Sequence, residues 1–189
     1  NGTASITSPS VKIYQNDTNT PHSLRHNHVT SICPDPLAPN RYIWLGTKGG
    51  GLHLFDKTTE KFTHFTAEKS DLPNDVVYGV LPGIPPSGKR GELWLSTNRG
   101  LSRLTVSAGQ APDQRTYRFL NFRASDGLQD DEFNTNAFAK MNDGTLLFGG
   151  VKGITVFDPA AIVERKLDAP VLLTDLKINN LAVSPLKWQ

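Results

Sequence analysis

The chain has 189 residues, of which 37% are apolar, and it carries 16 glycines, 13 prolines and a formal net charge of +2. This composition fits one or two globular domains rich in turns, and it excludes a disordered chain. The small, scattered charge argues against a nucleic-acid binder, and the single cysteine, Cys33, excludes an internal disulfide. No apolar run of about eighteen residues predicts a membrane-spanning helix.

The first part of the chain is predicted to consist of short strands joined by polar loops. Residues 1–10 are small and polar and are expected to be disordered, and residues 11–14 alternate as a short strand. A strand at 29–32, a hairpin at 42–56 and a strand at 61–66 follow, with proline-rich or polar stretches between them.

The same order of elements returns after about fifty residues. A strand at 76–81, a hairpin at 92–104 and a strand at 117–122 form the second unit. The third unit has predicted strands near 136–141, 145–149 and 153–157, and the sequence Asn-Asp-Gly between the first two favours a hairpin turn. Residues 159–166 form at most a short helix.

A four-stranded antiparallel unit that repeats at this period is the signature of a β-propeller blade. The predicted fold is therefore an all-β, partial β-propeller of about three blades. We assign residues 11–166 to this propeller fragment. It comprises the last strand of one blade at 11–14, blades at 28–66 and 74–122, and a partial blade at 134–158. An open arc of this kind exposes blade faces and strand edges, so we expect a longer propeller or a homo-oligomer formed through these edges.

Trp44 and Trp94 open the central hairpins of the first two full blades. We interpret both rings as blade core, because a large ring followed by small residues suits face-to-face packing of sheets. The alternative is an exposed platform on which a sugar or a base stacks.

Several stretches resemble the two-component regulator propeller repeat family. The resemblance rests on 44–56, which read Trp-Leu-Gly-Thr-Lys-Gly-Gly-Gly-Leu-His-Leu-Phe-Asp, on 72–78, which read Leu-Pro-Asn-Asp-Val-Val-Tyr, and on 93–101. Residues 126–150 are similar to the last repeat of such arrays. Residues 169–180 resemble the first strand of the immunoglobulin-like domain that follows the propeller in that family, which places the start of that domain within 167–189.

The resemblance implies a non-catalytic, periplasmic sensor fragment of a histidine kinase in the inner membrane. The parent protein is often a hybrid kinase and in some members a diguanylate cyclase. An oligosaccharide is the implied ligand, with no cofactor, and the implied partners are the remaining blades and the immunoglobulin-like domain of the same protein. The mechanism implied is a ligand-driven population shift in a dimeric sensor. This chain departs from the family in having far fewer blades and no kinase motif.

Polar residues at one predicted rim are the candidate ligand contacts. If the first strand of each blade starts at one rim, the turn between its second and third strands and the connection from the preceding blade share that rim. The candidates are Lys48, Asn98, Arg99, Glu132, Asn134 and Lys152. Their charges and amides suit hydrogen bonds to a hydroxyl-rich ligand or to a protein. The alternative is that these are solvated turn residues, and that Asn74 and Asp75 only start a strand.

Two further groups of residues have side chains suited to other chemistries. Asp126, Asp130, Asp131 and Glu132 lack the spacing of a calcium loop. Two carboxylates of this group can act as acid and base or nucleophile of a glycosidase, so a polysaccharide-processing hydrolase or lyase stays an alternative function, together with an interaction scaffold. The histidines at 22, 26 and 28 can chelate a metal or lie in a solvated loop. We expect no metal site and no catalytic residue in this chain.

Overall fold

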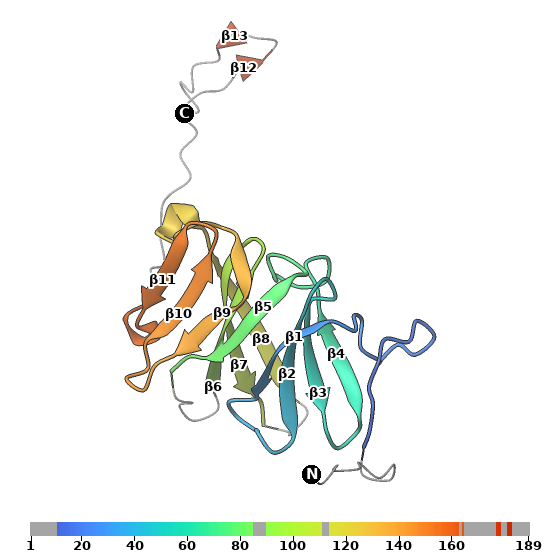
Figure 1. Cartoon of the computed structure of the whole chain (residues 1–189). Coiled ribbons are helices and arrows are strands. Elements are labelled where there is room, and N and C mark those ends of the chain that lie inside the picture. Colours follow the sequence, from blue (N-terminus) through green and yellow to red (C-terminus); the bar gives the residue numbers. More distant parts are fainter. Residues whose placement is uncertain are drawn as a thin grey trace.

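In the computed structural model, residues 29–157 form three antiparallel β-sheets of three or four strands that pack in sequence order (Figure 1). The structure describes residues 11–84, 90–110, 114–162, 164, 177–178 and 181–182. The first sheet contains β1 (Val29–Pro34), β2 (Tyr42–Thr47), β3 (Leu52–Asp56) and β4 (Lys61–Phe65). The second contains β5 (Val77–Pro82), β6 (Arg90–Thr97), β7 (Gly100–Ala108) and β8 (Arg115–Phe122). The third contains β9 (Phe133–Lys140), β10 (Leu146–Gly150) and β11 (Gly153–Phe157).

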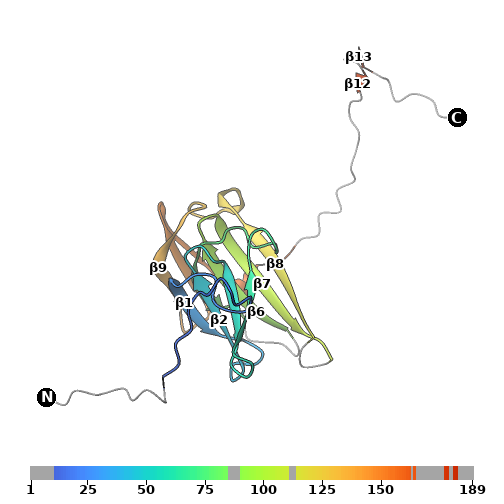
Figure 2. The same ribbon diagram turned by 90° about the vertical axis from the view of Figure 1, so that its right-hand side faces the viewer.

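The arrangement is that of a partial propeller, as predicted. Each sheet pairs its strands in chain order, and we call them A to D from first to last. The A strands β1, β5 and β9 are neighbours, whereas β8, a D strand, lies at the opposite edge (Figure 2). A strands that face a common centre are typical of blades around an axis.

Helical structure in the described residues is confined to two short 3₁₀ turns, η2 (Ala124–Asp126) and η3 (Pro159–Ala161). The position of η3 agrees with the short helix expected within 159–166. Among the residues that the structure describes, no helix has the length and hydropathy to cross a membrane.

The two tryptophans occupy the same register position in their sheets. Trp44 pairs with Cys33 and Leu54, and Trp94 takes the corresponding place between β5 and β7. Their side chains are buried, with 0% and 1% of their surface exposed, so the prediction of blade core is confirmed and the exposed platform is wrong. Each ring belongs to the core between its own sheet and the next one.

Aromatic rings fill both inter-sheet cores. The Trp44 ring lies 5.5 Å from Phe65 and 5.8 Å from Tyr117 of the second sheet. The Trp94 ring lies 5.3 Å from Phe122 and 4.6 Å from Phe157 of the third sheet. These centroid distances are those of favourable aromatic pairs, and burial of such rings supplies much of the energy that holds sheets together.

The prediction of a strand at residues 11–14 is wrong. This segment has no regular pairing, and Tyr14 instead packs its ring on Phe55 at 4.8 Å and Phe62 at 5.9 Å, on the outer face of the first sheet. A strand requires a neighbour with which to exchange backbone hydrogen bonds. The described residues contain no strand of a preceding blade with which residues 11–14 could pair. The segment is therefore held by the packing of the Tyr14 ring.

The two ends of the chain leave two predictions untested. Residues 1–10 and most of the predicted immunoglobulin-like start at 167–189 lie outside the described residues. Within the latter range, β12 (Lys177–Ile178) and β13 (Leu181–Ala182) pair with each other as a short hairpin. The partial blade predicted at 134–158 corresponds to the three strands β9, β10 and β11.

Candidate functional site

The turns between strands B and C lie on the same rim as the connections from one sheet to the next. In the first sheet, the backbone N–H groups of Gly49 and Gly51 donate to the carbonyl oxygen of Asp75, at 3.1 and 2.8 Å. In the second, the N–H of Gly100 donates to the carbonyl oxygen of Asp131 at 2.6 Å. The predicted sharing of one rim is therefore confirmed.

Threonine and glycine fix the shape of the two B–C turns. The hydroxyl of Thr47 donates to the carbonyl oxygen of Gly51 at 2.7 Å, and that of Thr97 donates to Gly100 at 2.8 Å. Both glycines have positive φ, +80° and +94°, and a Cβ on either would lie 2.1 Å from a strand D carbonyl oxygen. Glycine is required at both positions. Of the turn residues between the threonine and the glycine, Lys48, Gly49, Asn98 and Arg99 are exposed, whereas Gly50 is buried.

The aspartates of the D-to-A connections shape those loops. The Oδ1 atom of Asp75 accepts from the N–H of Ala67 at 2.8 Å, and that of Asp131 accepts from Ala124 at 2.7 Å. Asn74 accepts from a backbone N–H two residues later, at 2.8 Å. Side chains that bond to nearby backbone in this way are loop-building residues. The interpretation that Asn74 and Asp75 only start a strand fits these contacts.

Lys152 forms an ion pair with the loop that precedes the third sheet. Its Nζ lies 2.6 Å from Oδ2 of Asp130, and their side chains are 72% and 22% exposed. The hydrogen bond from Lys152 lowers the pKa of Asp130, and the same bond raises the pKa of Lys152. Both groups are therefore charged at neutral pH. An exposed pair of this kind is screened by salt and competes with a charged ligand for the ammonium group.

The other candidate residues of the B–C turns point to solvent. Lys48, Asn98 and Arg99 are all exposed. The Asn98 side-chain oxygen accepts a hydrogen bond from the Tyr78 hydroxyl at 3.3 Å. Within the described residues, the side chains of Lys48 and Arg99 form no ion pair, and both cations are available to a ligand.

Glu132 and Asn134 lie beside the turn of the third sheet. The carbonyl oxygen of Glu132 accepts from the N–H of Val151 at 3.2 Å, which joins the connection to the turn that carries Lys152. Both candidate side chains are exposed. The rim thus carries one candidate in the first sheet, two in the second and three around the third, all able to bond hydroxyl groups or a protein surface.

The histidine-rich loop and the acidic loop show structural contacts. The His26 and His28 rings lie 6.5 Å apart, and Nδ1 of His26 accepts from the N–H of His28 at 3.0 Å. Across the described part of the chain, no three His, Cys, Asp or Glu side chains gather as metal ligands.

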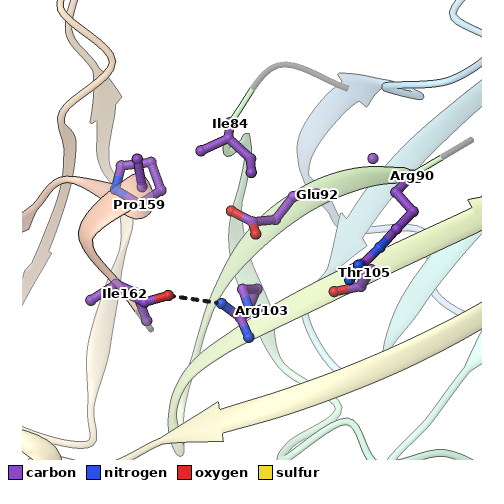
Figure 3. Close-up of a pocket in the computed structure, with 9 residues that line it drawn as sticks. Ile84, Arg90, Glu92, Arg103, Thr105, Pro159 and Ile162 are labelled. Carbon is purple, nitrogen blue, oxygen red and sulfur yellow. Dashed lines mark hydrogen bonds between the residues drawn. The ribbon is translucent and has the colours of Figure 1, made fainter. Parts of the chain in front are cut away.

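A cavity of about 320 Å³ on the opposite rim, between the second and third sheets, has no counterpart in the predicted site (Figure 3). Arg90, Glu92, Arg103 and Thr105 contribute polar side chains to its lining. One sequence signal could have indicated it: Glu92 and Arg103 are charged residues inside the apolar B and C strands. Charged residues are rarely buried without a specific partner.

The structure also contains a buried ion pair between the first and second sheets, and neither of its residues is among the predicted site residues. Oδ2 of Asp35 lies 2.6 Å from Nη2 of Arg115 and accepts from Nε1 of Trp44 at 2.8 Å. The two charged side chains are 0% and 6% exposed. No sequence pattern relates these residues, which lie 80 positions apart.

No protein-family model matches the chain. Among curated proteins, the chain is 30% identical over 137 residues to histidine kinase P4 of Formosa agariphila. That similarity covers 72% of this chain but spans only 9% of the kinase. Among solved structures, it is similar to the extracellular domain assigned to a hybrid two-component system of B. thetaiotaomicron, at 19% identity and a TM-score of 0.44. That match covers 93% of this chain and 29% of the other.

Proposed function

We propose that this chain is a non-catalytic part of the extracytoplasmic, periplasmic sensor region of a two-component histidine kinase. The observation that carries the proposal is the 30% identity to a histidine kinase over 137 residues, in a chain whose described residues form repeated β-sheets. A sensor built from repeats presents many loops on one rim, which suits recognition of a ligand.

The contacts at the glycine-rich turn favour a structural role over phosphate binding. A phosphate cradle presents free backbone N–H groups at the start of a helix. Here the run Gly49–Gly51 joins two strands, and the N–H groups of Gly49 and Gly51 already donate to Asp75. In this proposal the kinase chemistry, or a diguanylate cyclase in its place, belongs to another part of the parent protein.

The open face of the third sheet supports the proposal of further blades. Ile154 and Val156 of β11 are 57% and 54% exposed, on the face that corresponds to the Trp44 and Trp94 faces of the other sheets. A repeat unit buries such a face against a neighbour. We therefore expect additional blades and an immunoglobulin-like domain in the parent protein, or a second copy at this face, which light scattering of the isolated chain would reveal as a dimer.

Ligand binding at the rim is the proposed input. Lys48, Asn98, Arg99, Glu132, Asn134 and Lys152 combine donors and acceptors that match a hydroxyl-rich oligosaccharide. The D-to-A connections on this rim join one sheet to the next, so a ligand that contacts two turns favours one relative position of the sheets. Such a preference shifts the population of sensor conformations by the difference in affinity between them.

The test is autophosphorylation of the full-length parent kinase in lipid nanodiscs with a panel of defined neutral and acidic oligosaccharides. The expected result is that one member changes the rate, and that R99A weakens this response while K57A, an exposed lysine away from the rim, leaves it unchanged. Reducing-end release from the same panel would favour the polysaccharide-processing enzyme. A stable protein partner without any response to sugars would favour the scaffold.

The buried thiol gives no support to the enzyme alternative. Burial raises the pKa of Cys33 to about 11, so the reactive thiolate is scarce at neutral pH. Its Sγ donates to the carbonyl oxygen of Pro34 at 3.5 Å, inside the core of the first two sheets. Cys33 is a packing residue.

A further inference from the structure

The register of the sheets makes two inter-sheet grooves equivalent. Tyr42 opposite Asp56 in the first sheet corresponds to Glu92 opposite Thr105 in the second. In the same way Leu54, the partner of Trp44, corresponds to Arg103, the partner of Trp94. The grooves beside these residues lie on the rim opposite the B–C turns.

The first groove also holds a cavity, of about 340 Å³, and a side chain from strand D of the next sheet contributes to its lining. The Arg115 guanidinium lies 4.5 Å from the centre of the Tyr42 ring and pairs with Asp35 at 2.6 Å. The Asp35 carboxylate also accepts from the indole N–H of Trp44 at 2.8 Å. The buried anion therefore has a cation and an indole as partners.

In the second groove, Glu92 provides the equivalent carboxylate. Its Oε1 accepts from the indole N–H of Trp94 at 2.7 Å, and 8% of the residue is exposed. A Cβ on Gly83, which matches Asp35 in register, would lie 2.2 Å from that oxygen. The Glu92 carboxylate thus fills the place of Asp35. Among the residues described by the structure, no basic side chain forms an ion pair with it.

The buried donor in this groove belongs to Arg103. Its Nη1 donates to the carbonyl oxygen of Ile162 at 3.3 Å and its Nη2 lies 3.4 Å from Glu164, but its Nε is buried and lacks an acceptor within the described structure. The Arg103 side chain is 11% exposed. A buried N–H of a charged group without an acceptor is unfavourable, and native structures almost always provide one.

Both groups line the cavity of about 320 Å³ in Figure 3. We propose that this cavity binds a small carboxylate that also bears hydroxyl groups, such as a hexuronic acid. Arg103 holds the ligand carboxylate, and Glu92 accepts from a ligand hydroxyl. Glu164 lies against Arg103 but is shared with Arg118. The three arginines Arg90, Arg103 and Arg118 therefore outnumber the two carboxylates, Glu92 and Glu164, around the cavity, which favours an acid over a neutral sugar.

The remaining wall and the size agree with this class. Ile84, Pro159 and Ile162 supply apolar surface against which the C–H face of a sugar ring packs. The volume lies at the small end of the range for ligand sites, about 300 to 1,000 Å³, and suits one monosaccharide. The cavity is separate from the rim that carries the B–C turns. A cavity that binds no ligand would therefore not contradict the proposed sensor role.

Calorimetric titration of the whole chain with D-galacturonate, D-galactose and acetate tests the proposal. Galacturonate is expected to bind at least tenfold more tightly than either of the other two, because only it has both the carboxylate and the hydroxyls. R103L is expected to weaken galacturonate at least tenfold. This variant places at 103 the leucine that the first sheet has at 54, so the fold should tolerate it, and its thermal midpoint checks this.

R118Q is the matched control, because Arg118 lies on the neighbouring strand, pairs with Glu164 and does not line the cavity. Its affinity for galacturonate should equal that of the wild type. Equal binding of galactose and galacturonate would overturn the ligand class, and unchanged binding by R103L would overturn the site. Binding of none of the three probes would also overturn the proposal, and a lowered midpoint of R103L would then indicate that a segment of the protein itself fills the cavity.

Discussion

The grooves on the rim opposite the B–C turns each hold a cavity, of about 340 Å³ between the first and second sheets and about 320 Å³ between the second and third, but the two grooves differ in how their buried carboxylate is neutralised. Strand D of the second sheet supplies Tyr117 and Arg115, which cover Trp44 and neutralise Asp35. The third sheet ends at strand C in the described residues, and Phe157 covers Trp94 in its place. The fourth strand of a blade therefore supplies the cation that neutralises the buried carboxylate in the groove before it.

The two interfaces also meet one structural requirement, an acceptor for the buried indole N–H, from different sequence positions. Each tryptophan donates its indole N–H to a buried carboxylate, from Asp35 in a loop for Trp44 and from Glu92 on strand B for Trp94. A buried indole needs an acceptor, and either route provides it. Two sequence positions thus satisfy one physical demand.

Removal of either tryptophan should have the largest effect on the stability of the two inter-sheet interfaces. We expect Trp44→Ala to lower the free energy of unfolding by about 3–5 kcal/mol, because it removes a fully buried ring that contacts Phe65 and Tyr117. Trp94→Ala should fall in the same range, because its ring is equally buried and contacts Phe122 and Phe157. Urea unfolding monitored by circular dichroism measures both. A loss below about 2 kcal/mol for either variant would contradict the assignment of both rings to the inter-sheet cores.

The buried ion pair gives the next largest expected effect. Arg115→Met leaves Asp35 charged and buried, for which a loss of about 3 kcal/mol is typical. Combining it with Asp35→Asn should recover much of that loss, because the amide oxygen still accepts from Trp44. Arg118→Met on the same strand is the control, since the Arg118 side chain is 59% exposed. Equal losses from both single variants would remove the special role of the pair.

Acid should weaken the first sheet more than the second. Burial, with the nearby His64, lowers the pKa of His53 to about 3. In the unfolded chain, His53 is protonated as the pH falls below about 6.5, whereas in the folded chain it stays neutral. The free energy of unfolding is therefore highest above about pH 6.5 and falls as the pH drops towards 3. We expect a loss of about 2 kcal/mol between pH 6.5 and 5, at about 1.4 kcal/mol per unit.

His53→Gln tests this source of pH dependence, because a glutamine oxygen can still accept from the N–H of Arg25, which donates to His53 at 3.1 Å. The second sheet has Ser102 and Asn121 where the first has His53 and His64. Urea midpoints between pH 7.5 and 5 should therefore vary less in the variant. A slope identical to that of the wild type would assign the acid sensitivity to other groups.

The rim should contribute least to stability. Lys152→Ala removes only an exposed pair with Asp130, so the thermal midpoint in physiological salt should be unchanged. The same variant should weaken the response to any oligosaccharide that binds at the third sheet. A clear drop in the midpoint would show that the pair fixes the loop, and would count against a free ligand-binding lysine.

What the sequence could predict depends on distance along the chain. The Trp44 and Trp94 hairpins repeat within short stretches, and the strand order and the shared rim follow from that repeat. Asp35 and Arg115 meet only after two sheets pack, so no local pattern relates them. Residues 11–14 alternate like a strand, but this pattern indicates only that one face of the segment is buried. Tyr14 provides that buried face by packing on Phe55, without strand pairing. The role of the candidate rim residues as ligand contacts stays a proposal.

The bond between each D-to-A connection and the B–C turn beneath it has an evolutionary consequence. Asp75 and Asp131 hold the backbone of the rim through carbonyl and carboxylate oxygens, and these contacts do not involve the exposed side chains of Lys48, Asn98 or Arg99. Mutations at the exposed positions can therefore change the chemistry of the rim without altering the path of the chain. A lineage can diversify its specificity there while the scaffold stays the same.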